Sequence, residues 1–460
     1  MTSPKQSALL PLSPLTRAIH GEEEEELLLE HSHNSFGRSI GPDISVSTNF
    51  KSKPPSDLLA IVNRLGENRS RHSSTPNSPL VRFEDELGKV VKHDINLHSY
   101  KRYSQPTLAK AESVLSGLLN GDVLVYSSGL SAAFAALLHV QPDVIAIRDG
   151  YHGCHDTIKR YCQLRGMNER NSVEVKVIDL DDAYPPSSTG LKVLVWLETP
   201  VNPTGECRDI NSYAHKVREC ALGSELLVDS TFAPPPLSNP FAFGADIVLH
   251  SGSKYIGGHS DALLGLLVVQ KSKTGRWGQL WQDRTKLGLL PGSLETWLLI
   301  RSLKTLQIRV VHQSDTATRL AIWLNSLTER DYRSNIDQDE KRRLVQRVWH
   351  SSFQDAGKWV GFDSKTNEPR QMMGGGSPCF AFMLERPIFA KWLPHLTKIF
   401  VPATSFGGVE SLIQQQATAD PTCDPRIVRL SIGLEDFHDL KNDLIQAFDR
   451  VIRYERHSKL

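Results

Sequence analysis

The sequence lacks any excess of charge: its 460 residues include 53 Lys and Arg against 52 Asp and Glu, a net charge of +1. This balance gives no electrostatic reason to expect a nucleic acid or an anionic membrane surface as a partner. Long apolar runs are missing too. The longest, residues 262–269, is far too short to span a bilayer and is typical of a buried strand. We therefore expect neither nucleic acid nor membrane among its partners.

Cysteine is scarce, and its spacing is uninformative for metal binding. None of the six cysteines stands in a C-x-x-C pair; they are Cys154, Cys162, Cys207, Cys220, Cys379 and Cys423. That pattern favours free thiols in a reducing compartment over a disulfide framework or a zinc site. We expect no metal.

The organisation of the chain predicts an α/β protein. Residues 1–95 are expected to form an arm with polar insertions, since they contain an acidic run at 22–26, which argues against a mitochondrial presequence, and a polar stretch at 51–79. Residues 96–300 alternate apolar strands with helical stretches, which indicates a large domain with a mostly parallel sheet covered on both faces.

Residues 301–460 are expected to form a smaller α+β domain. An amphipathic stretch at 293–327 should bridge to this domain from the first one. Within it, strands are expected at 379–384 and 427–432, and a closing helix at 436–454.

Lys254 is the most informative residue of the large domain. An apolar run ending at 249 leads into a turn of hydroxyls and glycines that contains this single lysine. Burial in such a turn lowers the pKa of an amine, and a neutral amine can form an imine with a carbonyl. The alternative is a surface lysine in a strand-to-loop turn.

A buried strand at 225–229 ends in Asp229, at the edge where open α/β sheets place functional groups. Its carboxylate could pair with a protonated pyridine nitrogen and so keep the ring of a pyridoxal phosphate cofactor an electron sink. A plain helix cap or turn residue is the alternative.

Three further turns contain cofactor-binding candidates. Ser128, Gly129 and Leu130 lie between a strand at 122–126 and a helical stretch from 131, so backbone N–H groups converge there on a dianion such as phosphate, although many plain turns look alike. Tyr151 follows a strand end and could stack on a planar ring. Asn202 lies in a turn fixed by two prolines, from which its amide could reach a ring oxygen.

These segments, in this order, resemble the trans-sulfuration (Cys/Met metabolism) family of pyridoxal phosphate enzymes, from roughly residue 16 to 460. The resemblance implies an aspartate-aminotransferase-like fold (PLP fold type I), pyridoxal 5'-phosphate as cofactor, a small amino-acid substrate and a homo-oligomer built as a dimer of dimers. It also implies roles for further residues: Ser251 and Ser253 at the cofactor, Tyr100 and Arg102 at the cofactor phosphate of a neighbouring subunit, Arg429 at the substrate carboxylate, and Ser405 and Glu410 in a substrate-side loop. Lys254 and Tyr151 are the expected catalytic residues.

The residues themselves are compatible with two of these roles. In the strand around Arg429, the apolar Val428 and Leu430 share one face and Arg429 lies on the other, where its guanidinium could bind a carboxylate through two bonds or simply face solvent. Tyr100 and Arg102 are two apart and share a face if extended, although a surface arm gives the same pattern.

The reaction is harder to infer, because the sequence departs from the family pattern where specificity is set. The family's Asn-Pro-Thr, Tyr-Gly-Gly-Thr and His-Pro-Ala-Ser-Met-Thr-His segments are replaced at 105–107, 151–154 and 415–421. The loop at 407–411 looks closest to the cystathionine γ-synthase branch, which favours γ-replacement on an activated homoserine. A cystathionine β- or γ-lyase, a γ-replacement with another nucleophile, and a non-catalytic scaffold are the alternatives.

The last three residues are Ser458, Lys459 and Leu460, which match a receptor-read peroxisomal address. We therefore expect a peroxisomal protein, and otherwise a cytoplasmic one.

Overall fold

The computed structural model describes residues 42–51, 80–84, 90–94, 98–166, 174–271, 274–329, 332–333, 341–357, 359–363, 366 and 368–458. The acidic run at 22–26, residues 52–79 of the polar stretch, and the last two residues of the expected peroxisomal address lie outside the described residues.

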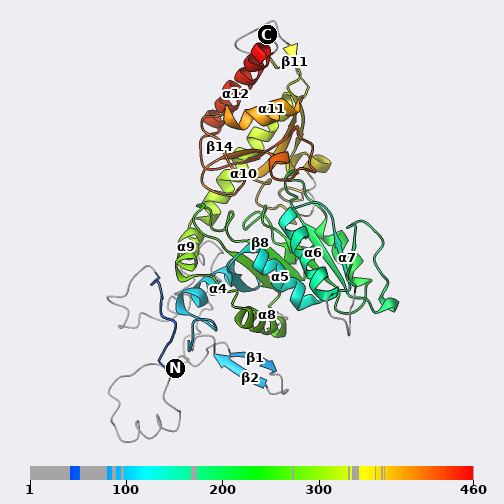
Figure 1. The fold of residues 1–460 in the computed structure, drawn as a ribbon, viewed down its shortest axis with the longest axis vertical. Coiled ribbons are helices and arrows are strands. Elements are labelled where there is room, and N and C mark those ends of the chain that lie inside the picture. Colours follow the sequence, from blue (N-terminus) through cyan, green and yellow to red (C-terminus); the bar gives the residue numbers. More distant parts are fainter. Residues whose placement is uncertain are drawn as a thin grey trace, which may run out of the picture.

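The larger lobe is built on a seven-stranded sheet (Figure 1). Only β9 runs antiparallel to its neighbours, and the remaining pairs are parallel, as the sequence predicts. In spatial order the strands are β3 (Asp122–Tyr126), β9 (Gly265–Val269), β8 (Ile247–Ser251), β7 (Glu225–Asp229), β6 (Val193–Glu198), β4 (Val144–Ile147) and β5 (Lys176–Ile178).

Helices cover both faces of this sheet. One face packs its apolar side chains against α5 (Gly129–Val140), α6 (His152–Gly166) and α8 (Thr274–Leu287). The other packs against α4 (Pro106–Leu118), α7 (Ile210–Arg218) and α9 (Ser293–Leu303). Because both faces are covered, β6 and β7 are buried along their whole length, and their interiors are continuously apolar rather than alternating.

The smaller lobe contains a five-stranded sheet and its own core. Its strands, in spatial order, are β12 (Val345–Trp349), β13 (Cys379–Leu384), β16 (Ile427–Ser431), β15 (Leu412–Gln415) and β14 (Val401–Pro402). Its core is completed by α10 (Leu306–Ser326), α11 (Pro387–Trp392) and α12 (Phe437–Ser458). Val428 and Leu430 of β16 belong to this core, on the face that the sequence assigns to them.

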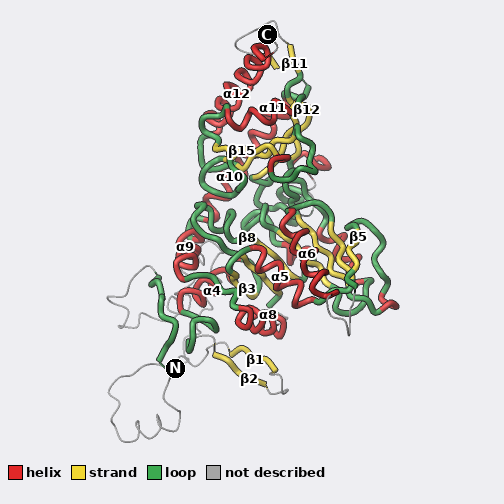
Figure 2. The backbone as a smooth tube through the Cα atoms, viewed as in Figure 1, coloured by secondary structure: helices red, strands yellow, loops and turns green. Residues whose placement is uncertain are grey.

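The bridge between the lobes is two helices rather than one continuous stretch. α9 ends at Leu303 and α10 begins at Leu306, so the expected boundary between residues 300 and 301 falls inside α9. The first turns of α10 pack into the core of the larger lobe and its later turns into that of the smaller lobe. In Figures 1 and 2 this helix runs from one lobe into the other.

Two short antiparallel pairs lie apart from the main sheets. They are β1 (Leu80–Glu84) with β2 (Val90–Asp94), and β10 (Tyr332–Arg333) with β11 (Lys341–Arg342). None of the helices in the described ranges combines the length and apolar character that a bilayer crossing needs.

Candidate active site

Lys254 lies on the turn after β8, at the boundary between the two lobes. Its Nζ donates to Ser405 Oγ at 3.0 Å and lies 4.9 Å from the centre of the Phe406 ring. Burial lowers the pKa of the Lys254 amine, and the positive charge of Arg429 lowers it further. A larger share of this amine is therefore neutral near pH 7 than for an exposed lysine, as a nucleophile or proton carrier requires.

Asp229 is the last residue of β7 and is buried, with 6% of its surface exposed. Thr231 donates twice to its Oδ1, from the backbone nitrogen at 3.0 Å and from the hydroxyl at 2.6 Å. Both bonds go to one oxygen, and Oδ2 is left without a hydrogen-bond donor among the described residues. Burial raises the pKa of this carboxyl, and the Thr231 bonds oppose the rise.

Glu198 is a second buried carboxyl that the sequence reasoning missed. It ends β6 and pairs with Asp229 across the sheet. Its Oε2 accepts from the backbone nitrogen of Tyr151 at 2.8 Å, and its Oε1 accepts from that of Asn202 at 2.7 Å. Burial raises its pKa, and so does the charge of Asp229. The signal was its place at the carboxyl end of a parallel strand, the same argument that selected Asp229.

Tyr151 is 40% exposed, so its ring is available for stacking. Gly153 lies beside it, and a Cβ at that position would come within 2.5 Å of the ring and displace it. Cys154, where the family pattern has threonine, is buried near both carboxyls; its burial, and then their charges, hold the pKa of its thiol well above the usual range.

The turn at residues 128–130 opens α5. Ser128 caps the helix by accepting from the backbone nitrogen of Ser131 at 3.0 Å, and α5 begins at Gly129. A methyl group on Gly129 would lie 3.5 Å from Ser251 Oγ, so this hydroxyl borders the first turn of the helix. The backbone N–H groups of Gly129 and Leu130 point out of the helix end, as an anion site needs. The hydroxyl of Ser253 is instead engaged with the backbone of Leu264, at 2.8 and 3.2 Å.

Arg429 is 5% exposed and reaches from β16 across to the larger lobe. Its Nη1 donates to Asn202 Oδ1 at 3.1 Å, which leaves the Asn202 amide nitrogen free to donate elsewhere. Its Nη2 donates to Gln414 Oε1 at 2.8 Å and to the carbonyls of residues 404 and 405. Nε and one Nη1 proton have no acceptor among the described residues, so each can still donate a charged hydrogen bond to a carboxylate oxygen.

The loop at 404–411 packs against the Lys254 turn. Gly407 has φ +81°, and a Cβ there would lie 2.6 Å from the backbone nitrogen of Tyr255. This close approach brings Ser405 to Lys254. Glu410, farther along the loop, is exposed, and no contact brings its carboxylate to Lys254.

Tyr100 and Arg102 are not brought to this site within one chain. Tyr100 is 41% exposed, and the Arg102 guanidinium lies 5.5 Å from its ring and 5.0 Å from that of Tyr103. Arg102 also donates to the carbonyl of Thr285, at the end of α8, at 3.4 Å. Their assignment to a neighbouring subunit's cofactor stays a prediction.

The assembled groups match the chemistry of pyridoxal phosphate. Asp229 Oδ2 needs a donor or a cation, which a protonated ring nitrogen provides. The Asn202 amide nitrogen could donate to a ring oxygen, and the N-terminal end of α5 could bind a phosphate. The Lys254 amine could form an imine with an aldehyde carbon. By contrast, no group of three or more His, Cys, Asp or Glu in the described part of the chain is arranged to hold a metal ion. All six cysteines lie in that part and are free.

Comparisons with a family model and with curated proteins point to the same enzyme family. The family model described as Cys/Met metabolism PLP-dependent enzyme matches residues 77–449. Cystathionine gamma-lyase of Saccharomyces cerevisiae is 30% identical over 453 residues, 95% of this chain and 97% of that protein. Cystathionine gamma-synthase of Mycobacterium tuberculosis is 32% identical over 76% of this chain and 85% of that protein. Cystathionine beta-lyase of Arabidopsis thaliana is 30% identical over 76% and 72%.

Solved structures agree on the fold. The structure of metB from Corynebacterium glutamicum matches with a TM-score of 0.70 at 24% identity, over 96% of this chain and 98% of that one. A methionine gamma lyase from Micromonospora echinospora matches with a TM-score of 0.67 at 26% identity, over 95% and 99%. Relatives named for different reactions are about equally similar, so similarity alone does not select the reaction.

Proposed function

Because the chain belongs to the Cys/Met metabolism family of PLP-dependent enzymes, we propose that it catalyses γ-replacement on an activated homoserine, with a thiol such as cysteine as the nucleophile. The observation that carries the proposal is the 3.0 Å distance between the Lys254 amine and Ser405 Oγ. Ser405 lies in the loop at 404–411, whose Gly407–Ser411 segment resembles the cystathionine γ-synthase branch. The names of the curated relatives above share cystathionine as the compound that is made or cleaved.

Each residue has a distinct task in this proposal. Arg429 binds the substrate carboxylate through the N–H groups that have no acceptor among the described residues, and Asp229 keeps a ring nitrogen protonated. Bound pyridoxal phosphate supplies an electron sink for negative charge at the substrate Cα. Lys254, with its lowered pKa, takes a proton from Cα and can return it at a neighbouring carbon, while Ser405 holds its amine in place.

A lyase is the second candidate, supported by the cystathionine gamma-lyase that covers 95% of this chain. The two are separated by incubating the holoenzyme with O-acyl or O-phospho homoserine plus cysteine and identifying the products. We expect cystathionine, with slow release of 2-oxobutanoate when cysteine is left out. Rapid cleavage of cystathionine, with activated homoserines inert, would establish a lyase instead. Cysteine and 2-oxobutanoate as products would indicate a γ-lyase, and homocysteine and pyruvate a β-lyase.

The role of Lys254 is tested independently of the substrate. Borohydride should attach the cofactor irreversibly to the peptide that contains Lys254, as seen by mass spectrometry. Lys254→Ala should lose this attachment and about a thousandfold or more in turnover, whereas Lys271→Ala, at an exposed position, serves as the matched control. Attachment at another lysine would remove Lys254 from the mechanism.

The proposed location is the peroxisome. Where Leu460 is the free carboxyl end, residues 458–460 should direct an N-terminal fluorescent fusion to peroxisomes, and a tag placed after Leu460 should abolish this targeting. Ser458 is the last residue of α12. A fusion that stays cytosolic with its end free would refute the assignment.

A further inference from the structure

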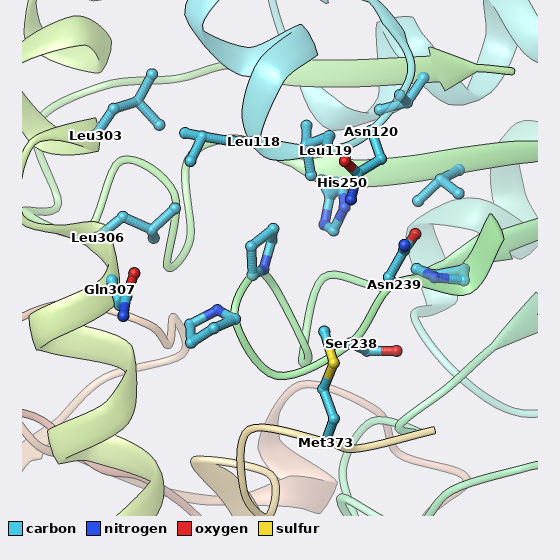
Figure 3. A pocket seen from close by; sticks show the side chains of 15 residues that line it. Leu118, Leu119, Asn120, Ser238, Asn239, His250, Leu303, Leu306, Gln307 and Met373 are labelled. Atoms are coloured by element: carbon cyan, nitrogen blue, oxygen red, sulfur yellow. The ribbon is translucent and has the colours of Figure 1, made fainter. Parts of the chain in front are cut away.

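A cavity of about 110 Å³ lies on the face of the larger sheet that α4 and α9 cover, and Lys254 does not line it (Figure 3). It is enclosed by the ends of α4 and α9, the start of α10, strands β8 and β9, and the loop at 235–240. None of the residues assigned above to the cofactor or substrate lines it. The proposed reaction therefore gives this cavity no role.

His250 faces this cavity from β8. Side chains alternate along a strand, so His250 lies on the opposite face from Leu249 and from Ser251, which borders the α5 end. It is 1% exposed, and neither ring nitrogen forms a hydrogen bond of normal geometry within the described residues. The backbone of Ser230 is close enough to influence the ring, but a bond to it would occupy only one nitrogen.

The ring is uncharged at neutral pH, because burial lowers the pKa of His250 to about 4. A neutral imidazole offers one donor and one acceptor. A ring nitrogen left without a partner in a buried site costs free energy. A partner inside the cavity would remove this cost.

The rest of the lining favours an uncharged and mainly apolar partner. Ten of the fifteen lining residues have apolar side chains, and none has a charged one. Asn120 is exposed, and Asn239 and Gln307 are partly exposed. Leu303 and Leu306 form apolar walls (Figure 3). About three waters would fit this volume, and five lining residues have polar side chains, so water is the competing occupant that the test must separate.

We propose that this cavity is a binding site for a small uncharged molecule with an apolar body and one hydrogen-bonding edge, of the size of an azole or a short amide. The hydrogen-bonding edge meets the imidazole of His250, and the apolar body lies against the leucine and proline side chains.

The site shares its walls with the catalytic segments. His250 directly precedes Ser251 and lies four residues before Lys254 on the same strand and turn, and the loop at 235–240 follows the segment of Asp229 and Thr231. A bound molecule therefore contacts the backbone elements that position Lys254 and Asp229. The binding itself does not depend on which reaction the enzyme catalyses.

The test uses the holoenzyme and pyrazole, which is uncharged at pH 7 and has a donor and an acceptor on a flat ring. Pyrazole should raise the melting temperature in a saturable way, because it binds the folded state alone. In crystals soaked with 4-bromopyrazole, the anomalous signal of bromine should lie in the cavity, with the azole edge at His250.

Two substitutions on α10 provide the comparison. Gln307→Trp places a large side chain at the cavity and should abolish both the shift and the bromine signal. Ile308→Trp, at the neighbouring position where the side chain is 66% exposed and does not line the cavity, should preserve both. Bromine only at other sites, ordered water alone in the cavity, or an equal shift in both variants would overturn the proposal.

Discussion

At Glu198, burial and a neighbouring negative charge act against two hydrogen bonds. The bonds from the backbone nitrogens of Tyr151 and Asn202 favour the ionised carboxylate, whereas burial and Asp229 favour the protonated form. Burial is the largest of these effects, so the pKa of Glu198 lies above its usual range. The two carboxyls thus concentrate negative charge where a protonated ring nitrogen would relieve it.

This shift predicts how the stability of the cofactor-free protein depends on pH. A carboxyl with a raised pKa binds its proton more strongly in the folded state than in the unfolded state. Its contribution to the free energy of unfolding is therefore present at low pH and is lost as pH rises from the ordinary glutamate range towards neutrality. The loss is at most about 1.4 kcal/mol per pH unit. Melting temperatures of the apoprotein should therefore fall between about pH 5.5 and about pH 7.5.

Glu198→Gln is the informative variant for this prediction. The glutamine side chain cannot ionise, so the melting temperature of this variant should fall less steeply with pH. One backbone N–H loses its carboxylate acceptor, so the free energy of unfolding should be lower by roughly 1–2 kcal/mol at every pH. Parallel profiles for the variant and the wild type would show that Glu198 is not the source of the decline.

The role of Arg429 can be tested by substitution. Arg429→Ala should lower kcat/KM by roughly 30- to 1,000-fold for every amino-acid substrate, mainly through KM, because a clamp on a carboxylate contributes about 2–4 kcal/mol. Arg426→Ala, which removes an arginine paired with Asp424 just before β16, is the matched control and should change kcat/KM little. Equal kinetics for both variants would leave Arg429 a structural residue only.

Among the elements, the loop at 404–411 matters most, because it brings a residue of the smaller lobe to Lys254. Its path depends on Gly407, which has a left-handed backbone and no room for a Cβ beside Tyr255. Gly190 has a similar φ of +70°, but a Cβ there would meet open space. An alanine at Gly190 therefore measures the free-energy cost of the backbone conformation alone, without the cost of a close contact.

We predict that Gly190→Ala loses about 1 kcal/mol of stability, from its backbone conformation alone, and keeps full activity. Gly407→Ala should lose more stability and at least about tenfold in kcat, because the loop must move away from Lys254. Denaturant unfolding and steady-state kinetics of both variants check this. Similar losses in both variants would mean that the contact with the Lys254 turn is unimportant.

The elements also show what could be read from the sequence. The strands ending at Asp229 and before Lys254 follow from local apolar runs, and the structure has them at those places. The helix expected from residue 131 begins two residues earlier, at Gly129, so Gly129 and Leu130 belong to its first turn. The bond from Lys254 to Ser405 and that from Arg429 to Asn202 join residues 151 and 227 positions apart. No local pattern encodes such pairs, and so only the family resemblance predicted that Ser405 and Arg429 belong to the site.

Glu198 and the two-helix bridge were missed for different reasons. Glu198 had the same strand-end signal as Asp229 but no known partner to draw attention to it. The helical pattern at 293–327 is nearly continuous, and the break at residues 304–305 comes without a proline or glycine. At the break, the guanidinium of Arg309 donates to the carbonyls of Ser302 and Tyr255, and periodicity cannot show such contacts.

For the whole molecule, the site depends on two lobes that α10 connects. Lys254 and Asn202 come from the larger lobe, and Ser405 and Arg429 from the smaller one, so a change in the angle between the lobes would separate the amine from its hydroxyl partner. Tyr100 and Arg102 lie elsewhere on the larger lobe, which leaves them free to serve a second copy of the chain.

The last prediction tests that sharing between subunits. If Arg102 completes the site of a neighbouring copy, Lys254→Ala and Arg102→Ala variants should each be nearly inactive alone. When the two are unfolded and refolded together, about a quarter of the sites should contain neither substitution, because half of the dimers are mixed and each mixed dimer has one intact site. Activity should rise accordingly, with mass spectrometry confirming the mixed dimers. Mixed dimers without regained activity would mean that Arg102 acts within its own chain, through its contacts with Tyr103 and Thr285.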